Sequence, residues 1–442
     1  MPTETGGMAR VRWRQLHLPH NAAAALLIGL LIREIFSFWT GHPFDFELWV
    51  RLGYAMLHGG NPYNSLPAVP GLSFANIYSP QSTATIAYLP FWPVVTGLMY
   101  IVYSGIGFGN RFAYYFLLKQ PVIAGDIALA YLLYSYILAK TSKQVGAIWA
   151  LRLWAFSPFT ILLSGVWGMF DSIAMSLILI SLMATNPWKR GFWIGLGIFT
   201  KGLACLYAIP ATLRKEKRFQ ALFLAVLLPA ATSFLAIILM GWPLSTAAMT
   251  LVSAGGKGGV SMSAWDVLDY LVYLGLPPTS PPTLYRALGF VWIPALLAFT
   301  LLAFWKLGFE TDYGLVQSAL LVTLAFLIFK ARVTEQYAIY LLALAAIDVA
   351  IWNPQRKRLL MVTMVVAMFY LIVNNYFLVR FLSPVYPDYT KFESALSQFD
   401  LIRRTILFLS GTTFTILNIL YFTTILKHIG HLPPDTMSSV RT

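Results

Sequence analysis

Two carboxylates, Asp45 and Glu47, lie in an aromatic segment, residues 44–49, directly after the first long apolar run of the chain. A carboxylate in such a place can accept the proton of a hydroxyl group during a transfer reaction. If the segment is helical, Glu47 lies one turn before Arg51 and can pair with it. Asp45 has no such neighbour and is therefore the better candidate for a catalytic base. The alternative is that Asp45 only caps the N-terminus of a short helix.

A second polar cluster, residues 330–337, joins two apolar runs. Arg332, Glu335 and Gln336 are three and four positions apart, so the start of a helix would place them on one face. An arginine guanidinium can donate two hydrogen bonds to one phosphate, and Lys330 adds a second cation. The cluster therefore predicts a phosphate-binding corner. The alternative is that the basic side chains only reach from a helix end to the membrane surface.

Further ionisable residues lie inside apolar runs, where each costs on the order of 3 kcal/mol. Lys119 and Asp126 are seven positions apart and share a helix face. Such charges either serve a function or pair across helices to hold the protein together, and both alternatives stay open. Arg33 and Lys201 are the two that we take as candidates for substrate binding. The cross-helix pairs expected in the second alternative join Asp126 or Asp171 to Arg152 or Lys201.

The composition indicates which elements must position these groups. Of 442 residues, 58% are apolar and 11% are charged, whereas soluble domains carry roughly 25% charged residues. A helix that spans a membrane needs about 20 mostly apolar residues. The sequence therefore predicts an all-α, polytopic transmembrane helix bundle that forms a single membrane domain, residues 1–442. The twelve candidate spans lie near residues 21–40, 84–104, 118–139, 145–163, 167–185, 191–211, 220–240, 287–305, 313–330, 335–352, 359–379 and 405–426.

The short basic loops at residues 214–218 and 356–358 predict the orientation, because lysine and arginine gather on the cytoplasmic side. With twelve spans, both termini lie on that same side. Three long loops then lie outside, at residues 41–83, 241–286 and 380–404. Long loops rich in aromatic residues are expected to pack as short interfacial helices.

Charge and residue types also exclude several classes of function. The net charge of +14 comes from basic residues at the ends of apolar runs, so nucleic-acid binding is not expected. The chain has one cysteine, Cys205, and cannot form an internal disulfide. Six histidines without clustered ligand spacing predict no cofactor and no obligatory metal. A divalent metal held by Asp45 and Glu47 stays open as an alternative.

The first outer loop resembles that of the GT-C glycosyltransferases, membrane enzymes that take a sugar from a polyprenyl-phosphate carrier. The resemblance begins with Asp45-Phe46-Glu47 and Trp49, and continues with Gly60-Asn61-Pro62-Tyr63 and Tyr78-Ser79-Pro80. In that superfamily the acidic residue at this place is the catalytic base. The resemblance therefore implies that Asp45 is the base and that Glu47 is the second acid.

Other segments of the chain extend the resemblance over about residues 25–345. Residues 167–172 resemble a Gly-Gln-Phe-Asp segment, although Met169 replaces the usual glutamine. Residues 195–201 resemble a span that runs from glycine to lysine. Residues 330–337 resemble the motif beside the donor phosphate, and Thr334 replaces the histidine or asparagine of some relatives. The phosphate contact is then expected from Arg332, together with Lys330.

The resemblance implies transfer of one sugar, with mannose as the family expectation, from a polyprenyl- or dolichyl-phosphate donor. The acceptor would be a hydroxyl of a glycan, glycolipid or protein at the outer face, and the sugar carbon would invert. The host membrane would be a prokaryotic cell membrane or the endoplasmic reticulum. Two alternatives stay open, a multi-pass transporter of a solute or lipid and a noncatalytic subunit of a larger complex. The lack of an internal repeat weighs against the transporter.

Overall fold

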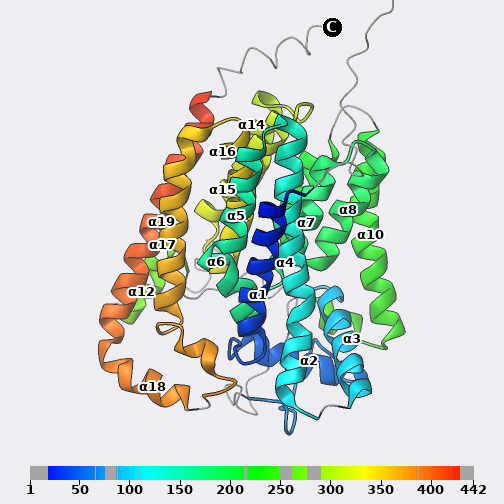
Figure 1. Ribbon diagram of the computed structural model, residues 1–442, viewed down its shortest axis with the longest axis vertical. Coiled ribbons are helices and arrows are strands. Elements are labelled where there is room, and N and C mark those ends of the chain that lie inside the picture. The colour runs from blue at the N-terminus through cyan, green and yellow to red at the C-terminus, as the bar shows by residue number, and fades with distance from the viewer. Residues whose placement is uncertain are drawn as a thin grey trace, which may run out of the picture.

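The computed structural model describes residues 18–64, 66–74, 86, 88–107, 109–213, 217–248, 261–275, 290–386 and 388–428, and among them every regular element is a helix (Figure 1). The first elements are α1 (His20–Ser37), α2 (Asp45–Leu57), α3 (Phe91–Ile106), α4 (Arg111–Thr141), α5 (Gln144–Phe156), α6 (Pro158–Ile161) and the π-helix η2 (Leu162–Trp167). Next come α7 (Asp171–Met183), α8 (Pro187–Thr200), the 3-10 helix η3 (Gly202–Tyr207), α9 (Ala208–Thr212), α10 (Arg218–Leu239), η4 (Ala264–Asp266), α12 (Val267–Tyr273) and α14 (Trp292–Lys306). The last are α15 (Asp312–Phe329), η5 (Glu335–Tyr337), α16 (Ala338–Ile351), η6 (Pro354–Arg356), α17 (Lys357–Asn374), η7 (Val379–Leu382), α18 (Tyr389–Leu396), η8 (Ser397–Phe399) and α19 (Asp400–His428).

The helices are those of a polytopic membrane bundle, as the composition predicts. Every predicted span overlaps a helix. Within the described ranges, six helices are long and apolar enough to cross a membrane, and the pair α5 and α6–η2, bent by 46°, could form a seventh crossing. The predicted number of twelve is not confirmed, because several apolar runs fold into shorter or interrupted helices. The run at 191–211, for example, changes from α-helix to 3-10 helix at Lys201.

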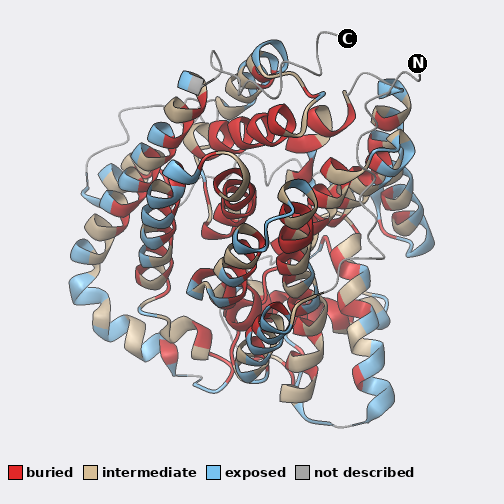
Figure 2. Cartoon of the chain, turned by 45° about the horizontal axis from the view of Figure 1, so that its top comes forward, coloured by how far each residue is buried: buried red, intermediate tan, exposed pale blue. Residues whose placement is uncertain are grey.

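The bundle has a central pair of helices, α15 and α16. In α15, 83% of the apolar window is buried, whereas in the peripheral helix α10 the share is 17%. Helix α16 packs against α4, α5, α7, α15 and α17, so its apolar side chains meet protein on all sides. Figure 2 shows this buried centre in red, surrounded by helices whose outer faces are exposed. A helix that is apolar all round belongs in such a place.

Short helices occupy the long loops that were predicted to lie outside. The loop at 41–83 contains α2, the loop at 241–286 contains η4 and α12, and the loop at 380–404 contains α18. Helices α2 and α18 lie at the lower end of the bundle in Figure 1. The motif Tyr78-Ser79-Pro80 lies outside the described residues.

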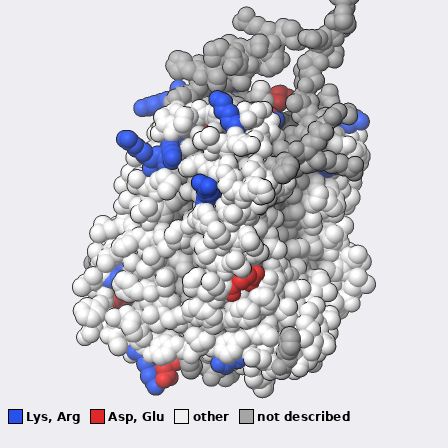
Figure 3. Space-filling view, viewed as in Figure 1, with Lys and Arg blue, Asp and Glu red and all other residues white. Residues whose placement is uncertain are grey.

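Basic side chains gather toward the opposite, upper end of the bundle, as the face drawn in Figure 3 shows. At the start of α17, Lys357 and Arg358 are exposed, whereas Arg356 is buried and pairs with Asp348 at 2.9 Å. The basic loop at 214–218 is described only at its last two residues, both exposed. The assignment of this end to the cytoplasm stays a prediction.

Candidate active site

Asp45 is the first residue of α2, in the turn that follows α1. Its Oδ2 accepts a hydrogen bond of 3.0 Å from the indole Nε1 of Trp167, and its side chain is 33% exposed. The capping role considered for Asp45 belongs instead to His42, whose Nδ1 accepts hydrogen bonds from the backbone N–H groups of Phe44 and Asp45 at 3.3 and 3.4 Å. The Asp45 carboxylate is thus left with a hydrogen bond to one side chain and a partly open surface.

His42 is neutral in this arrangement. A ring nitrogen that accepts two backbone N–H groups carries no proton, so the 3.4 Å contact between Nδ1 and Asp45 Oδ2 joins two acceptors and is not an ion pair. Burial, followed by the positive charge of Arg380, lowers the pKa of His42 well below its usual value. The ring stacks on Trp167 with centroids 4.6 Å apart. His42 therefore shapes the turn and leaves the charge of Asp45 in place.

A buried lysine, Lys119 of α4, ties this turn to the π-helix η2. Its Nζ donates to the carbonyl oxygen and Oγ1 of Thr40, and to the carbonyl oxygens of Gly165 and Val166, over 2.7 to 3.0 Å. Gly165 and Val166 are in the last turn of η2, where a helix leaves its carbonyl oxygens without backbone partners, and π-helical turns are often found at functional sites. The same cation therefore holds both the turn that begins α2 and the segment that presents Trp167.

The electrostatic environment of Asp45 includes residues from two other predicted motifs. Burial raises the pKa of Asp45, the hydrogen bond from Trp167 lowers it, and the positive charges of Lys201 and Arg332 lower it further. The negative charge of Asp171 acts in the opposite direction. Charged residues from the α7–α8 region and from the segment after α15 thus contribute to the electrostatic environment of this one carboxylate.

Lys201 lies at the break between α8 and η3, where the backbone turns extended. Its Nζ makes a buried ion pair with Asp171 at 2.6 Å, one of the cross-helix pairs expected from the sequence. An interrupted helix at membrane depth is tolerated where it is covered by protein or lines a cavity. The ammonium also lies 5.1 to 5.7 Å from the ring centroids of Tyr88, Phe170 and Tyr337.

Arg332 and Lys330 lie in the extended segment that follows α15. The backbone of Val333 is fixed on both sides, because its N–H donates to Ser261 Oγ and its carbonyl accepts from the N–H of Met262, each over 2.8 Å. Arg332 is exposed and has no hydrogen-bond or ion-pair partner among the residues that the structure describes. Burial, followed by the charge of Arg332, lowers the pKa of Lys330. The two cations thus stand together without an acidic partner in the described parts of the chain.

Glu335 and Gln336 begin the short helix η5 on the buried side of the same segment. Glu335 Oε1 accepts a hydrogen bond of 2.7 Å from Asn374 Nδ2 at the end of α17. Burial is the largest cause that raises the pKa of Glu335, and the negative charge of Asp45 raises it further while Arg380 lowers it. The charge of Asp45 therefore acts on Glu335, although the two carboxyl groups have different hydrogen-bond partners.

Glu47 has a different environment from Asp45. Its side chain is fully buried, Oε1 pairs with Arg51 at 2.6 Å, and Oε2 accepts from the backbone N–H of Phe74 at 2.9 Å. The pairing with Arg51 considered from the sequence is therefore present. Glu47 links α2 to the loop that follows it, and its catalytic role stays a prediction with both oxygens engaged.

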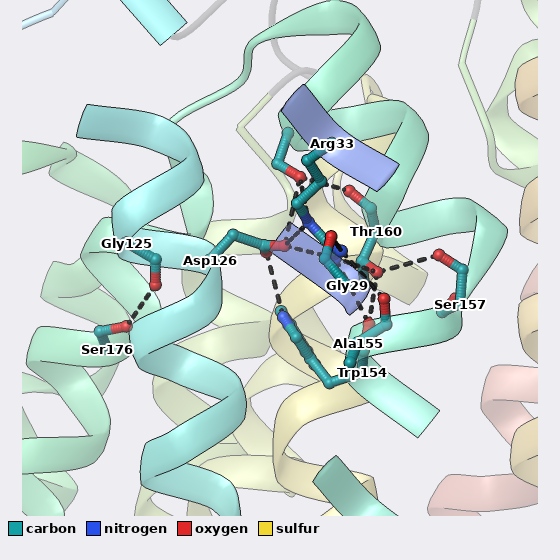
Figure 4. Close-up of polar contacts among 10 residues, drawn as sticks. Gly29, Arg33, Gly125, Asp126, Trp154, Ala155, Ser157, Thr160 and Ser176 are labelled. Atoms are coloured by element: carbon teal, nitrogen blue, oxygen red, sulfur yellow. Dashed lines mark hydrogen bonds and ion pairs between the residues drawn. The ribbon is translucent and has the colours of Figure 1, made fainter. Parts of the chain in front are cut away.

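Arg33 is held inside the bundle between α1, α4 and α5 (Figure 4). Its Nε donates to Asp126 Oδ2 at 2.6 Å, and Nη1 donates to the carbonyl oxygens of Gly29 and Ala155. Asp126 in turn accepts from Trp154 Nε1 at 3.0 Å. The structure thus pairs Asp126 with Arg33 and leaves Arg152 exposed. A substrate-binding role for Arg33 stays a prediction, since its polar atoms are engaged in this cluster.

Sequence analysis did not single out three residues that surround Asp45 and Glu335. These residues are His42, Asn374 and Arg380. His42 precedes α2 by three positions, whereas the N-cap position is Phe44, so no capping pattern marks His42 in the sequence. Asn374 is the last residue of α17 and Arg380 directly follows the predicted span at 359–379, so a search for polar residues at the predicted outer ends of spans would have found them.

Metal binding stays open. Within the described ranges, no group of three His, Cys, Asp or Glu side chains is arranged to hold a metal ion. Asp45 and Glu47 engage different partners, Trp167 and Arg51. A metal dependence is therefore a matter for direct measurement.

Comparisons with known proteins find a similarity in three-dimensional structure. No known protein family and no curated protein sequence matches this chain. Among solved structures, it is similar to the crystal structure of the Archaeoglobus fulgidus oligosaccharyltransferase in the apo form, with a TM-score of 0.39 and 13% sequence identity. The similarity covers 92% of this chain and 56% of the archaeal chain, so this chain spans little more than half the length of that protein.

Proposed function

We propose that this protein is an integral membrane glycosyltransferase that transfers one sugar from a polyprenyl-phosphate donor to an acceptor hydroxyl. Mannose is the first sugar to test. The observation that carries the proposal is the environment of Asp45. This carboxylate is partly exposed, it accepts a hydrogen bond from Trp167, and the positive charges of Lys201 and Arg332 lower its pKa. The reaction requires both groups, because the base accepts the proton of the attacking hydroxyl and the cations stabilise the departing phosphate.

The proposed reaction is a single displacement. The Asp45 carboxylate takes the proton of the acceptor hydroxyl, and the acceptor oxygen forms a bond to the anomeric carbon of the sugar. The bond from that carbon to the phosphate oxygen breaks, and polyprenyl phosphate leaves with the electron pair. The sugar carbon inverts, because attack and departure occur on opposite sides.

The cations near Asp45 have the task of stabilising the leaving phosphate. Arg332 is exposed and suited to a two-pronged contact with phosphate oxygens, and Lys330 adds charge beside it. Lys201 is engaged with Asp171 and serves as a fixed positive charge close to the base. Gln336 and Glu335 lie on the same segment and would contact the sugar or the acceptor. Glu47 and Arg33 have no part in this proposal.

The test is turnover of a defined donor by the purified chain in lipid nanodiscs. The donors are polyprenyl-phosphate mannose, glucose and arabinose, and the acceptor is a total glycolipid extract. Release of polyprenyl phosphate and the mass of new glycolipids are followed by mass spectrometry, with and without a chelator. We expect release from one donor only, and Asp45→Asn should slow it by about 10²–10⁴-fold. No release from any donor by a folded protein would overturn the proposal.

A carrier of lipid or solute is the second candidate, favoured by the interrupted helix at Lys201. Transporters often use broken helices and unpaired charges near the middle of the membrane. The two functions separate in proteoliposomes loaded with the active donor. A carrier would move the intact donor between leaflets without releasing polyprenyl phosphate, whereas the proposed enzyme forms a new glycosidic bond.

A further inference from the structure

A groove lies between α1, α5 and α17, near the start of each helix, and its cavity volume is 760 Å³. Asp45 follows the other end of α1, so the groove opens at the opposite end of the bundle from the candidate active site. Arg152 and Lys357 are the charged residues of its lining, and Asn21 and Gln144 add two side-chain amides. No acid is present among the described lining residues.

Arg152 has an unusual place for a charge. It lies eight positions after the start of α5, about 12 Å along the helix axis, and it is exposed. In the described parts of the chain it has no hydrogen-bond or ion-pair partner, in contrast to the buried cations Arg33 and Lys119. An arginine on a lipid-facing helix is costly unless it meets an anion or reaches the interface.

The geometry brings the two cations toward one end of the groove. Side chains on a helix tilt toward its N-terminus, so Arg152 extends toward the beginning of α5, where Gln144 lies. Lys357 is the first residue of α17 and its Nζ lies 5.2 Å from the ring centroid of Trp149. The positive charges and the amides thus collect near the membrane surface.

The remaining lining is apolar and faces the bilayer. Val145 is 83% exposed and Met361 is 39% exposed, although both are hydrophobic. Trp149 adds an aromatic ring of the kind found at the membrane interface. Figure 3 shows basic side chains on the upper part of the face drawn there, mostly uncharged surface below them, and an acidic patch near the middle of the face. A groove with an apolar lining and two cations at one end is suited to bind a molecule that has acyl chains and an anionic head group.

We propose that this groove is a binding site for an anionic phospholipid of the leaflet opposite Asp45. The phosphate is held by Arg152 and Lys357, the amides of Asn21 and Gln144 contact the head group, and the acyl chains lie along the apolar lining. The site is independent of the proposed sugar transfer, because it lies at the other end of the bundle. It would make the stability of the protein depend on the lipid composition of that leaflet.

The test is lipid binding to the full chain by native mass spectrometry. Phosphatidylglycerol is titrated against phosphatidylcholine, and the fraction of protein that retains lipid is measured. The wild type should retain phosphatidylglycerol in preference. We expect about a five-fold loss of affinity for each cation removed and about 25-fold for Arg152→Gln with Lys357→Gln. Both side chains are exposed, so these changes should leave the fold intact, as a thermal unfolding scan can verify.

Matched controls are Lys306→Gln and Arg218→Gln, which remove exposed cations outside the groove. Lys306 lies over the ring of Trp305 at 3.8 Å, much as Lys357 lies near Trp149, and Arg218 lies near the ring of Phe219. The controls should bind as the wild type does. Equal loss in the controls, unchanged binding in the double variant, or equal retention of phosphatidylcholine would each overturn the proposal. Displacement of the lipid by excess inorganic phosphate would instead assign the site to a free anion and would also overturn it.

Discussion

The cluster around Arg33 and the cluster around Asp45 differ in how far their polar atoms are engaged. Arg33 donates to a carboxylate, to backbone carbonyls and to hydroxyls, and Asp126 accepts from both Arg33 and Trp154. Asp45 receives a hydrogen bond from Trp167 and stays partly exposed, and Arg332 has no partner among the described residues. Both clusters place charges near a membrane, but only the second leaves polar atoms for another molecule.

This difference gives a way to sort charged residues in a membrane protein. A buried charge with all of its hydrogen bonds made is expensive to disturb and contributes to the fold. A charge that keeps an open side and lies close to an opposite charge can take part in binding or catalysis. Substitutions in the Arg33 cluster should therefore lower stability, whereas substitutions in the Asp45 cluster should lower activity.

The largest effect is expected from Asp45→Asn. The amide cannot accept the acceptor proton, so turnover should fall by about 10²–10⁴-fold. The unfolding temperature should change little, since the side chain is partly exposed. The measurement is release of polyprenyl phosphate from the active donor. Near-normal turnover by a folded variant would remove Asp45 from the role of base.

The next largest effect is a loss of stability from Asp126→Asn. The substitution leaves the buried Arg33 without its anion, which costs about 3–5 kcal/mol. The double change Arg33→Met with Asp126→Leu removes both charges and should recover much of that loss. Unfolding in detergent micelles measures both variants. A stable Asp126→Asn protein would show that the cluster is not a structural one.

Arg332→Ala tests the open side of the second cluster. Loss of one hydrogen-bonded contact to a charged phosphate should raise the donor KM on the order of ten-fold, with Lys330 limiting the effect. The control is Lys391→Ala in α18, an exposed cation that already pairs with Asp388 at 3.0 Å. An unchanged donor dependence for Arg332→Ala would separate this arginine from the phosphate.

The smallest effect concerns pH. A base works in its ionised form, so activity is present above the pKa of Asp45 and is lost as the pH falls through it. Burial raises that pKa from its usual value near 3.8, so the acid limb of kcat/KM should lie above that value. Trp167→Phe removes a hydrogen bond to the carboxylate and should move the limb upward by up to about one pH unit. A shift to lower pH would contradict the assignment.

The sequence predicted the helices well, because long apolar runs leave few alternatives in a membrane. The run at 359–379, for example, corresponds to α17. The number of crossings was not confirmed. The break at Lys201 and the bend after α5 depend on tertiary packing, which the length and composition of an apolar run do not predict. Periodicity alone could not foresee which charges would be engaged.

The candidate site could be predicted only in part for the same reason. Asp45 stood out because it follows an apolar run and has no local partner for its charge, and Arg332 stood out because a second cation, Lys330, lies two positions before it between two apolar runs. The hydrogen bond from Trp167 joins residues 122 positions apart, and two of the four contacts of Lys119 are to carbonyl oxygens of the π-helix η2. Such contacts arise from the folded arrangement and have no local signal in the sequence.

The anchoring of Lys119 has a consequence for how substrates could reach the carboxylate. Lys119 binds both the α1–α2 turn and η2, so Asp45 and Trp167 cannot move apart without breaking its two contacts to Thr40 or its two contacts to Gly165 and Val166. Beside Arg332, two hydrogen bonds from described residues, Ser261 and Met262, hold the backbone of Val333. If the site opens to admit a bulky lipid-linked sugar, the segment with Arg332 is therefore expected to move, while Asp45 keeps its position and orientation.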